Sequence, residues 1–412
     1  MGIEKRLNFL RNPERRKARS VKKTYFKFCI LQAAYWSFFA AMPAYIVAYM
    51  LSKGMGGATL GILLAAQMGS AFAGSIFWGR FVDRKQASRK FFLIGISAAA
   101  LLSVALFCFA DRPVVLFVLY PLFGFMNGPI ATTLDSWVIA SMHQVEAGAK
   151  SRTFGTLGYA VTMLVSGLII SRFGYRFMPY IGMAFIAVAF LVALRQPEVK
   201  GLRVAASAGK NSLGALRHAP KYLLLVAVVF FTGMAIGPIN NMKVLVFESV
   251  GGDASFLGWD AFIGCLIQSP FLIFAARMKR IRGEYRLIAG ALCAFTYALI
   301  VCIARNPAMV VIGTIFMNVS FGLLFPTMRE ITEASVSSDM RTTAHAVVDI
   351  AYGSVANMIA SAWSGSVIES AGKATMCSIC MGLAAIALAF CVGIILVGRT
   401  RTCKHLAQKA CT

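Results

Sequence analysis

Long apolar stretches alternate with short polar and basic segments along almost the whole chain. Each stretch has about 20 residues or more, the length that an α-helix needs to cross the hydrocarbon core of a bilayer. Twelve such stretches occur, at about 26–50, 57–80, 91–110, 113–136, 152–172, 177–195, 221–248, 255–276, 285–304, 307–328, 343–369 and 374–397. The pattern therefore predicts an all-α membrane protein with twelve transmembrane helices.

The longest internal polar segment separates these spans into two sets of six. The predicted organisation is a basic N-terminal tail (1–25), a six-helix bundle (26–195), a linker (196–220), a second six-helix bundle (221–397) and a C-terminal tail (398–412). The two sets share residues at a nearly constant spacing. Gly155 and Gly353, Ser166-Gly167 and Ser364-Gly365, and Gly174 and Gly372 are 198 residues apart, Leu60-Gly61 and Leu257-Gly258 are 197 apart, and Pro43 and Pro238, like Gly56-Gly57 and Gly251-Gly252, are 195 apart. This internal repeat predicts two pseudo-symmetric bundles, which are typical of secondary transporters whose solute site lies between the halves near the membrane midplane.

Composition and charge exclude several classes of protein. With 58% hydrophobic and 14% charged residues, the chain is neither a soluble enzyme nor a disordered protein. Of its 41 Lys and Arg residues, 34 lie in the tails, the linker and the other connections of one side, and six lie on the opposite side. This bias predicts a multi-pass protein of the cell (inner or plasma) membrane with both termini in the cytoplasm. Anionic membrane lipid, and not nucleic acid, is the expected partner of the positive charge.

The sequence contains no nucleotide-binding loop, metal-ligand cluster or catalytic triad. Its four histidines, His143, His218, His345 and His405, are scattered along the chain. We therefore expect no cofactor, no metal and no enzymatic activity.

A glycine and charged residues follow the second span. The segment Gly79-Arg80-Phe81-Val82-Asp83-Arg84 precedes Arg89-Lys90. It resembles the G-x-x-x-D-R/K loop signature of the major facilitator superfamily, although Gln86 stands where that signature has a glycine. The resemblance implies a conformational latch made by Gly79, Asp83 and Arg84, in which Asp83 caps a helix N-terminus or pairs with a cation. The alternative is a turn with solvated charges.

Asp135 near the end of the fourth span and Arg152 at the start of the fifth are predicted to pair. Both are equidistant from the hairpin midpoint near 143.5, so antiparallel helices would hold them at equal depth. The run Arg152-Thr-Phe-Gly155-Thr-Leu-Gly158-Tyr159 resembles the lactose-permease-like branch of the superfamily, which comprises oligosaccharide, nucleoside and phenylpropionate proton symporters. The resemblance implies that Asp135, Arg152 and Tyr159 contact the solute. Spans 8 and 10 of this chain have Gln268 and Asn318 but lack the coupling acids and histidine of that branch, so proton coupling must use other groups.

A charge inside hydrocarbon is costly, so each ionisable residue within a span is a functional candidate. Lys243 follows Pro238, Asn240 and Asn241, which suggest a broken helix lining a cavity. It would bind an anionic group, pair with an acid or extend to the outer interface. Asp260 is expected near the outer surface, within reach of water. Asp135 and Asp349 are the proton-coupling candidates, Asp349 because burial favours the neutral form of a carboxyl.

Amides and aromatic rings within the spans complete the predicted solute site. The predicted substrate-binding residues are Asp135, Arg152, Tyr159, Trp36, Asn127, Asn240, Lys243, Gln268 and Asn318. Such groups suit a sugar, a nucleoside or an aromatic acid, although each alone could be an interhelical hydrogen bond or an interface anchor. We expect a secondary active transporter coupled to proton symport. The alternatives are a drug efflux pump working by proton antiport and a non-transporting receptor or scaffold.

Overall fold

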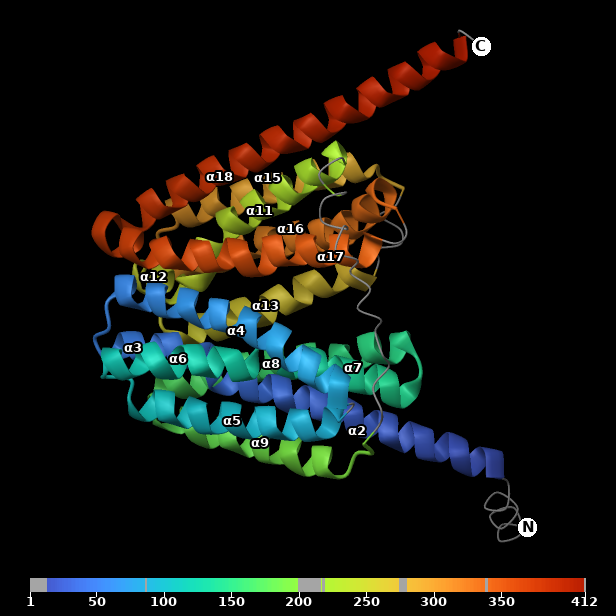
Figure 1. Ribbon diagram of the computed structural model, residues 1–412. Helices are drawn as coiled ribbons and strands as arrows, with labels where there is room; N and C mark the ends of the chain where they lie inside the picture. The colour runs from blue at the N-terminus through green and yellow to red at the C-terminus, as the bar shows by residue number, and fades with distance from the viewer. Residues whose placement is uncertain are drawn as a thin grey trace, which may run out of the picture. The chain divides into compact units, whose positions relative to one another are not determined.

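The computed structural model describes residues 13–85, 87–198, 216, 219–273, 280–337 and 340–410 (Figure 1). These residues form helices, with no strand among them. The first part of the chain forms α2 (Pro13–Ala41), η1 (Pro43–Tyr45), α3 (Ile46–Ser52), α4 (Gly57–Lys85), α5 (Ser88–Cys108), α6 (Pro113–Asn127), α7 (Ile130–Met142), α8 (Val145–Phe173), η2 (Tyr175–Phe177) and α9 (Met178–Leu194). The second part forms α11 (Pro220–Asn241), α12 (Lys243–Glu248), α13 (Ala254–Ile273), α15 (Gly283–Ile303), α16 (Pro307–Ser335), α17 (Arg341–Asp349), η4 (Ile350–Val355) and α18 (Ala356–Ala410).

Ten helical ranges within the described residues are long and apolar enough to cross a membrane. The last of them, Thr343–Val397, contains two spans, because the backbone of Gly372 leaves the helical conformation and α18 turns there (Figure 1). A shorter apolar helix covers Ala254–Gln268. These helices match the twelve predicted spans and confirm the all-α membrane fold.

Several spans consist of two helices instead of one. Pro43 starts η1 within the first span, and Pro129 stands between α6 and α7 in the fourth. The seventh span is interrupted at Met242, whose backbone N–H still donates to the carbonyl of Pro238. The sequence predicted a broken helix from Pro238, Asn240 and Asn241, and the break falls directly after Asn241. The eleventh span contains the π-helix η4, a local widening often found at functional sites.

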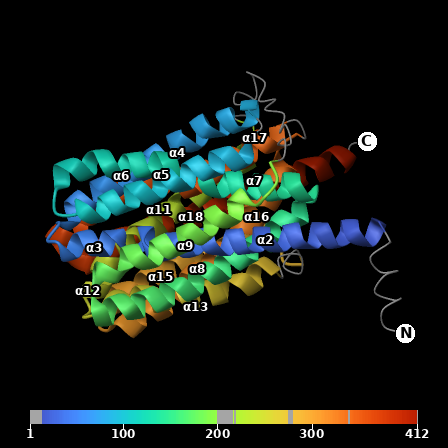
Figure 2. The same ribbon diagram turned by 90° about the horizontal axis from the view of Figure 1, so that it is seen from below.

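The described residues form two compact units. Unit 1 comprises the described residues within Met1–Ile46, Ser70–Cys108 and Leu122–Val204, and unit 2 those within Val47–Gly69, Phe109–Pro121 and Ala205–Thr412. In unit 1, α2 packs against α8 and α9, and α5 packs against α7 and α9 (Figure 2). In unit 2, α11 packs against α18, α15 against α16 and α18, and α13 against α16. The predicted division into bundles at 26–195 and 221–397 stays a prediction.

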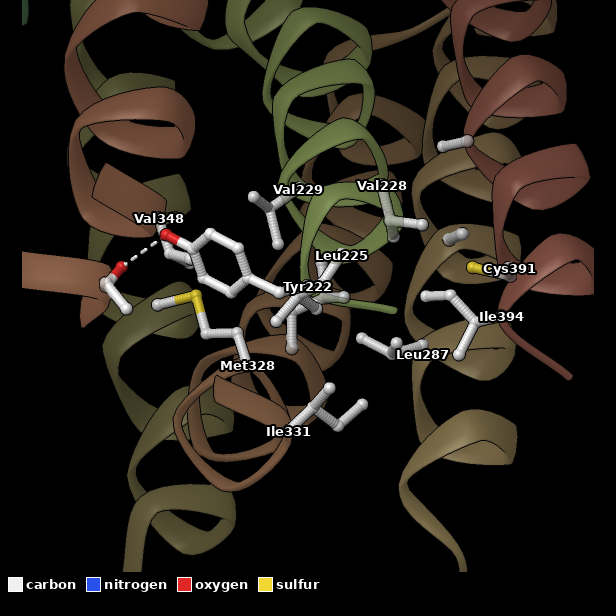
Figure 3. Packing of buried hydrophobic residues seen from close by; sticks show 14 of the residues in the cluster. Tyr222, Leu225, Val228, Val229, Leu287, Met328, Ile331, Val348, Cys391 and Ile394 are labelled. Carbon is white, nitrogen blue, oxygen red and sulfur yellow. Dashed lines mark hydrogen bonds between the residues drawn. The ribbon is translucent and has the colours of Figure 1, made fainter. Parts of the chain in front are cut away.

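An apolar cluster joins α11, α15, α16, α17 and α18 of unit 2 (Figure 3). Its buried side chains include Tyr222, Leu225, Leu287, Met328, Ile331, Val348, Cys391 and Ile394. The Tyr222 hydroxyl donates a hydrogen bond of 2.9 Å to the carbonyl of Ala344, so this buried polar atom is satisfied. The cluster accounts for the close packing of these five helices.

The internal repeat is visible in the backbone. Gly174 (φ 80°, ψ 174°) and Gly372 (φ 81°, ψ 170°) have the same conformation and are 198 residues apart. Gly54 (φ 86°) and Gly251 (φ 76°) follow α3 and α12 and are 197 residues apart. Glycine alone adopts positive φ without strain, which explains its presence at these turns. By backbone conformation Gly251 thus corresponds to Gly54, at an offset of 197 residues, whereas the sequence match of Gly251 with Gly56 has an offset of 195.

Helix ends differ from the predicted span ends. α2 begins inside the predicted tail 1–25, α8 begins seven residues before its predicted span, and α18 continues beyond residue 397. These additional turns contain charged residues, so the apolar stretch that marks each span does not include them. Of the predicted linker 196–220, residues 199–215 and 217–218 lie outside the described residues.

Candidate functional site

Asp135 on α7 and Arg152 on α8 form an ion pair in unit 1. The Arg152 Nη1 atom donates to Asp135 Oδ2 at 2.6 Å, which confirms the pairing expected from the hairpin. The Arg152 side chain is 52% exposed and that of Asp135 is 22% exposed. The arginine therefore keeps donors available for a further group.

Gln32 on α2 connects this pair to Trp36. Its Nε2 donates to Asp135 Oδ1 at 2.7 Å, and its Oε1 accepts from Trp36 Nε1 at 3.2 Å. Because a carboxylate only accepts and an indole N–H only donates, these two contacts fix the orientation of the Gln32 amide. Both oxygens of Asp135 are therefore bonded, one to Arg152 and one to Gln32.

Aromatic rings lie beside the ion pair. The Arg152 guanidinium is 5.6 Å from the centre of the Trp36 ring, and the Tyr159 ring meets Trp36 edge-on at 6.4 Å. Tyr35 packs against Trp36 and donates from its hydroxyl to Asn127 Oδ1 at 3.4 Å. The five residues predicted in the first half, Trp36, Asn127, Asp135, Arg152 and Tyr159, thus belong to one connected group with Gln32 and Tyr35. Such a group can bind hydroxyl or carboxylate oxygens through Arg152 and an aromatic or sugar ring through Trp36.

Close packing of α2 against α8 builds this group. A Cβ atom added to Gly155 would overlap Cδ1 of Trp36, and one added to Gly158 would lie 2.9 Å from the carbonyl oxygen of Ala33. Glycines at these positions let the two helices approach closely, as small residues do in membrane proteins. The ring of Trp36 consequently reaches Arg152, one turn before Gly155.

A second charged group lies in unit 2. Lys243 Nζ is 2.7 Å from Asp260 Oδ2 and 3.2 Å from Thr314 Oγ1, and both charged side chains are buried. The expectation that Asp260 lies within reach of water is wrong. α13 packs against α16, and the Asp260 side chain is buried beside Thr314. Neither Asp260 nor Thr314 was among the predicted site residues.

A signal for Asp260 was present in the sequence. Lys243 and Asp260 are 17 residues apart, as are Asp135 and Arg152. The midpoint of 243 and 260 falls at Gly251-Gly252, in the turn between α12 and α13. Equal distance from this midpoint therefore indicates the Lys243–Asp260 pair in the same way as it indicates the Asp135–Arg152 pair.

The other residues predicted in the second half are not all brought together. Asn318 donates to the Thr314 carbonyl at 2.9 Å and so adjoins the Lys243 group. Asn240 is exposed at the end of α11, and Gln268 is half-buried on α13. In the part of the chain that the structure describes, neither joins the Lys243 group by a hydrogen bond. Asn241 instead donates to Ser361 at 2.8 Å.

Asp349 at the end of α17 pairs with Arg329 of α16. The distance from Arg329 Nη2 to Asp349 Oδ2 is 2.7 Å, and the side chains are 35% and 41% exposed, respectively. Asp349 is therefore not the buried carboxyl that the sequence suggested, since 41% of its side chain is exposed near the start of the eleventh span.

The predicted latch lies at the end of α4. Gly79 and Arg84 are within this helix, which runs to Lys85, so the segment expected between two spans is helical. Arg84 is exposed, and the side chain of Asp83 lies outside the described residues.

Comparisons with known proteins agree with this architecture. A family model described as "MFS_1 like family" matches residues 26–378, whereas a comparison with curated proteins gives no match. The crystal structure of the nucleoside transporter NupG is similar with a TM-score of 0.75 and 16% identity, over 90% of this chain and 98% of that chain. An auto-inhibited peptide transporter of the POT family gives 0.69 and 13%, over 92% and 97%. A bacterial homolog of the human lysosomal transporter Spinster, inward-facing and unoccupied, gives 0.65 and 11%, over 91% and 95%. At these identities the likeness establishes the fold.

Proposed function

The chain belongs to the MFS_1-like family and is a multi-pass transporter of the major facilitator type, and on this premise we propose that it moves a small polar or aromatic organic solute by proton symport. A sugar, a nucleoside or an aromatic acid is the proposed class of solute. The observation that carries the proposal is the connected group of Asp135, Arg152, Gln32, Trp36 and Tyr159. It combines a half-exposed cation with aromatic faces, a combination suited to a ring that carries oxygen atoms.

Proton coupling is proposed at Asp135 and Asp349. Asp135 lies at hydrogen-bond distance from Arg152, and Asp349 lies at hydrogen-bond distance from Arg329. Protonation of the carboxylate weakens the ion pair and leaves the arginine free for the solute. A solute gradient can then drive protons across the membrane, because the solute binds the two protonation states of the protein with different affinities.

The membrane orientation and the conformational change are also proposed. The bias of Lys and Arg supports a protein of the cell membrane with both termini in the cytoplasm. The two repeats, 26–195 and 221–397, would alternate the exposure of the solute site between the two sides of the membrane. Gly79, Asp83 and Arg84 would stabilise one of the two states as a latch.

One observation favours drug efflux as a second candidate. An open apolar groove in unit 2, with a volume of about 430 Å³, is lined by side chains of α11, α17 and η4. The lining residues are Leu223, Val226, Ala227, Phe230, Phe231, Val347, Ile350, Ala351 and Val355. A lipophilic molecule would fit this lining better than a sugar would.

Purified protein in liposomes that hold a pH-sensitive dye tests the proposal. Lactose, uridine, 3-phenylpropionate and a lipophilic cationic dye are added one at a time, and the internal pH is recorded. Protein-free liposomes give the blank, because neutral forms of weak acids cross lipid unaided. Solute-driven acidification above the blank supports symport and names the solute class. Proton-driven movement of the lipophilic dye alone supports efflux, and silence for all four compounds contradicts both candidates.

A further inference from the structure

The Lys243 group of unit 2 is a closed triangle of three side chains from three helices. Lys243 of α12 contacts Oδ2 of Asp260 on α13 and the hydroxyl of Thr314 on α16. The Thr314 hydroxyl in turn donates to the other carboxylate oxygen, Oδ1. The side chains of Lys243 and Asp260 are 6% and 8% exposed, so water has little access to either charge.

This burial distinguishes Asp260 from the other aspartates that pair within the spans. Asp135 and Asp349 have arginine partners that are 52% and 35% exposed, so solvent screens those pairs. Lys243 and Asp260 depend on each other, because a buried charge without its partner is strongly unfavourable. Any event that neutralises Asp260 therefore leaves the Lys243 ammonium in need of another anion.

Asp260 supplies the carboxyl group of this cluster of titratable side chains. The titratable side chains that face it are Lys243 on α12, Cys265 on its own helix α13 and Tyr297 on α15. Tyr297 adjoins Cys377 and Cys380 of α18, and α16 contributes Thr314, which does not titrate. Thiols and phenols ordinarily stay protonated at neutral pH, so a proton arriving here binds the Asp260 carboxylate.

Lys243 is carried on a separate short helix. α12 has six residues and is separated from α11 by Met242, whose backbone (φ −99°, ψ 21°) is not helical. Such an interruption lets α12 turn without unwinding α11, in the manner of discontinuous helices that hold ions and solutes in transporters. The Lys243 ammonium also lies 5.9 Å from the Tyr297 ring, which gives it a second favourable neighbour besides the carboxylate.

From these contacts we propose that Asp260 takes up a proton during transport and that Lys243 then binds the carboxylate of an organic anion, which makes the solute an acid. This inference rests on the proposed symport and names the solute class within it. The charges balance: a proton binds to the Asp260 carboxylate, and the solute carboxylate replaces Asp260 as the counter-ion of Lys243. The net charge of the site is zero before and after. Proton and anion consequently strengthen each other's binding by the same factor.

The first test measures protons taken up when the wild-type protein binds an anion in detergent. Purified protein in weakly buffered solution is mixed with 3-phenylpropionate or with its uncharged amide, and the pH change is recorded. Uptake of about one proton per bound acid, with none for the amide, is the expected result. Acid binding without proton uptake, or no preference for the acid over the amide, would overturn the inference.

The second test uses neutral variants of each partner. Asp260→Asn mimics the protonated acid and should retain exchange of labelled 3-phenylpropionate, while proton uptake falls more than about tenfold. Lys243→Gln should weaken binding of the acid by more than about tenfold and that of the amide little. Glu248→Gln, which changes an exposed acid on the same short helix, is the matched control and should resemble wild type.

The double variant Lys243→Gln/Asp260→Asn separates a structural pair from a coupling pair. If the pair only holds α12, α13 and α16 together, the double variant should regain proton-coupled uptake of 3-phenylpropionate, and that result would overturn the inference. If either single variant fails to fold, as judged by gel filtration, the wild-type proton measurement decides the matter alone. Proton-coupled uptake of lactose or uridine, with no binding of the acid, rejects this inference and leaves the proposed symport standing.

Discussion

Gly155 on α8 and Trp36 on α2 fit together only because Gly155 has no side chain. A Cβ atom at position 155 would overlap Cδ1 of the Trp36 ring. The same ring donates to Gln32 and lies 5.6 Å from the Arg152 guanidinium. The spacing of two helices therefore sets the position of the aromatic face beside the ion pair.

Gly155→Ala should disturb the candidate site without touching a charged residue. The added methyl group displaces Trp36, at a cost of about 1–3 kcal/mol if the helices cannot separate. We expect solute affinity to fall roughly tenfold, which corresponds to about 1.4 kcal/mol. Solute exchange across liposomes measures this change. Gly382→Ala on α18, where a Cβ atom meets nothing within 4 Å, is the matched control. Unchanged affinity in Gly155→Ala would show that the Trp36 ring does not contact the solute.

Arg152→Ala should abolish transport while the protein remains inserted in the membrane. The substitution removes the half-exposed cation and leaves Asp135 bonded only to Gln32. Lys150→Ala removes the same charge from the same helix, but Lys150 pairs with the exposed Glu146 and not with the site. We expect Lys150→Ala to transport normally in the liposome assay. Full activity of Arg152→Ala would exclude Arg152 from the solute site.

Asp349→Asn should reduce proton coupling with little effect on stability. The Arg329–Asp349 pair is half-exposed, and such pairs contribute about 0–1 kcal/mol. Solute-driven proton influx should fall about tenfold, whereas solute exchange without a pH gradient should persist. Glu146→Gln changes another exposed, paired acid and serves as the control. Normal proton influx in Asp349→Asn would exclude Asp349 from proton coupling. Of the two coupling residues predicted from the sequence, Asp135 would then remain.

Glu330→Ala should lower the thermal stability of the protein in detergent. Glu330 Oε2 lies 2.6 Å from Nη2 of Arg286, whose side chain is 2% exposed. Without Glu330 the buried guanidinium loses its counter-ion, which we expect to cost about 1–3 kcal/mol. Glu333→Ala on the same helix α16 removes a 60% exposed acid and should change the unfolding temperature little. Equal unfolding temperatures for the two variants would contradict this role of Glu330.

Thiol labelling of intact cells tests the proposed orientation. Cys108 is exposed at the end of α5, and the charge bias assigns this end to the outer side. Cys302, which is half-buried at the end of α15 on the same predicted side, is first replaced by serine. A membrane-impermeant maleimide should then label Cys108, and the further substitution Cys108→Ser should remove the signal. Cys403 and Cys411, in the tail predicted to be cytoplasmic, should react only after the membrane is permeabilised. Labelling in the Cys108→Ser variant before permeabilisation would reverse the orientation.

The features that could be predicted from the sequence depend on residues close together in the chain. The apolar stretches were found because each helix must satisfy its backbone hydrogen bonds alone in the bilayer. The Asp135–Arg152 contact followed from equal distances to one hairpin midpoint, which neighbouring antiparallel helices preserve. The repeat of Gly174 and Gly372 was visible because both turns need the same positive φ.

Contacts between helices far apart in the chain were decided by tertiary packing. Gln32 and Asp135 are 103 residues apart, and only the packing of α2, α7 and α8 brings them to 2.7 Å. Asn240 is exposed while Asn241 bonds to Ser361, because neighbouring residues of one helix face different directions. The sequence by itself thus determined the spans, the repeat and the local ion pair. The burial of Lys243 and Asp260, and their closure by Thr314 across three helices, depended on packing that no local pattern encodes.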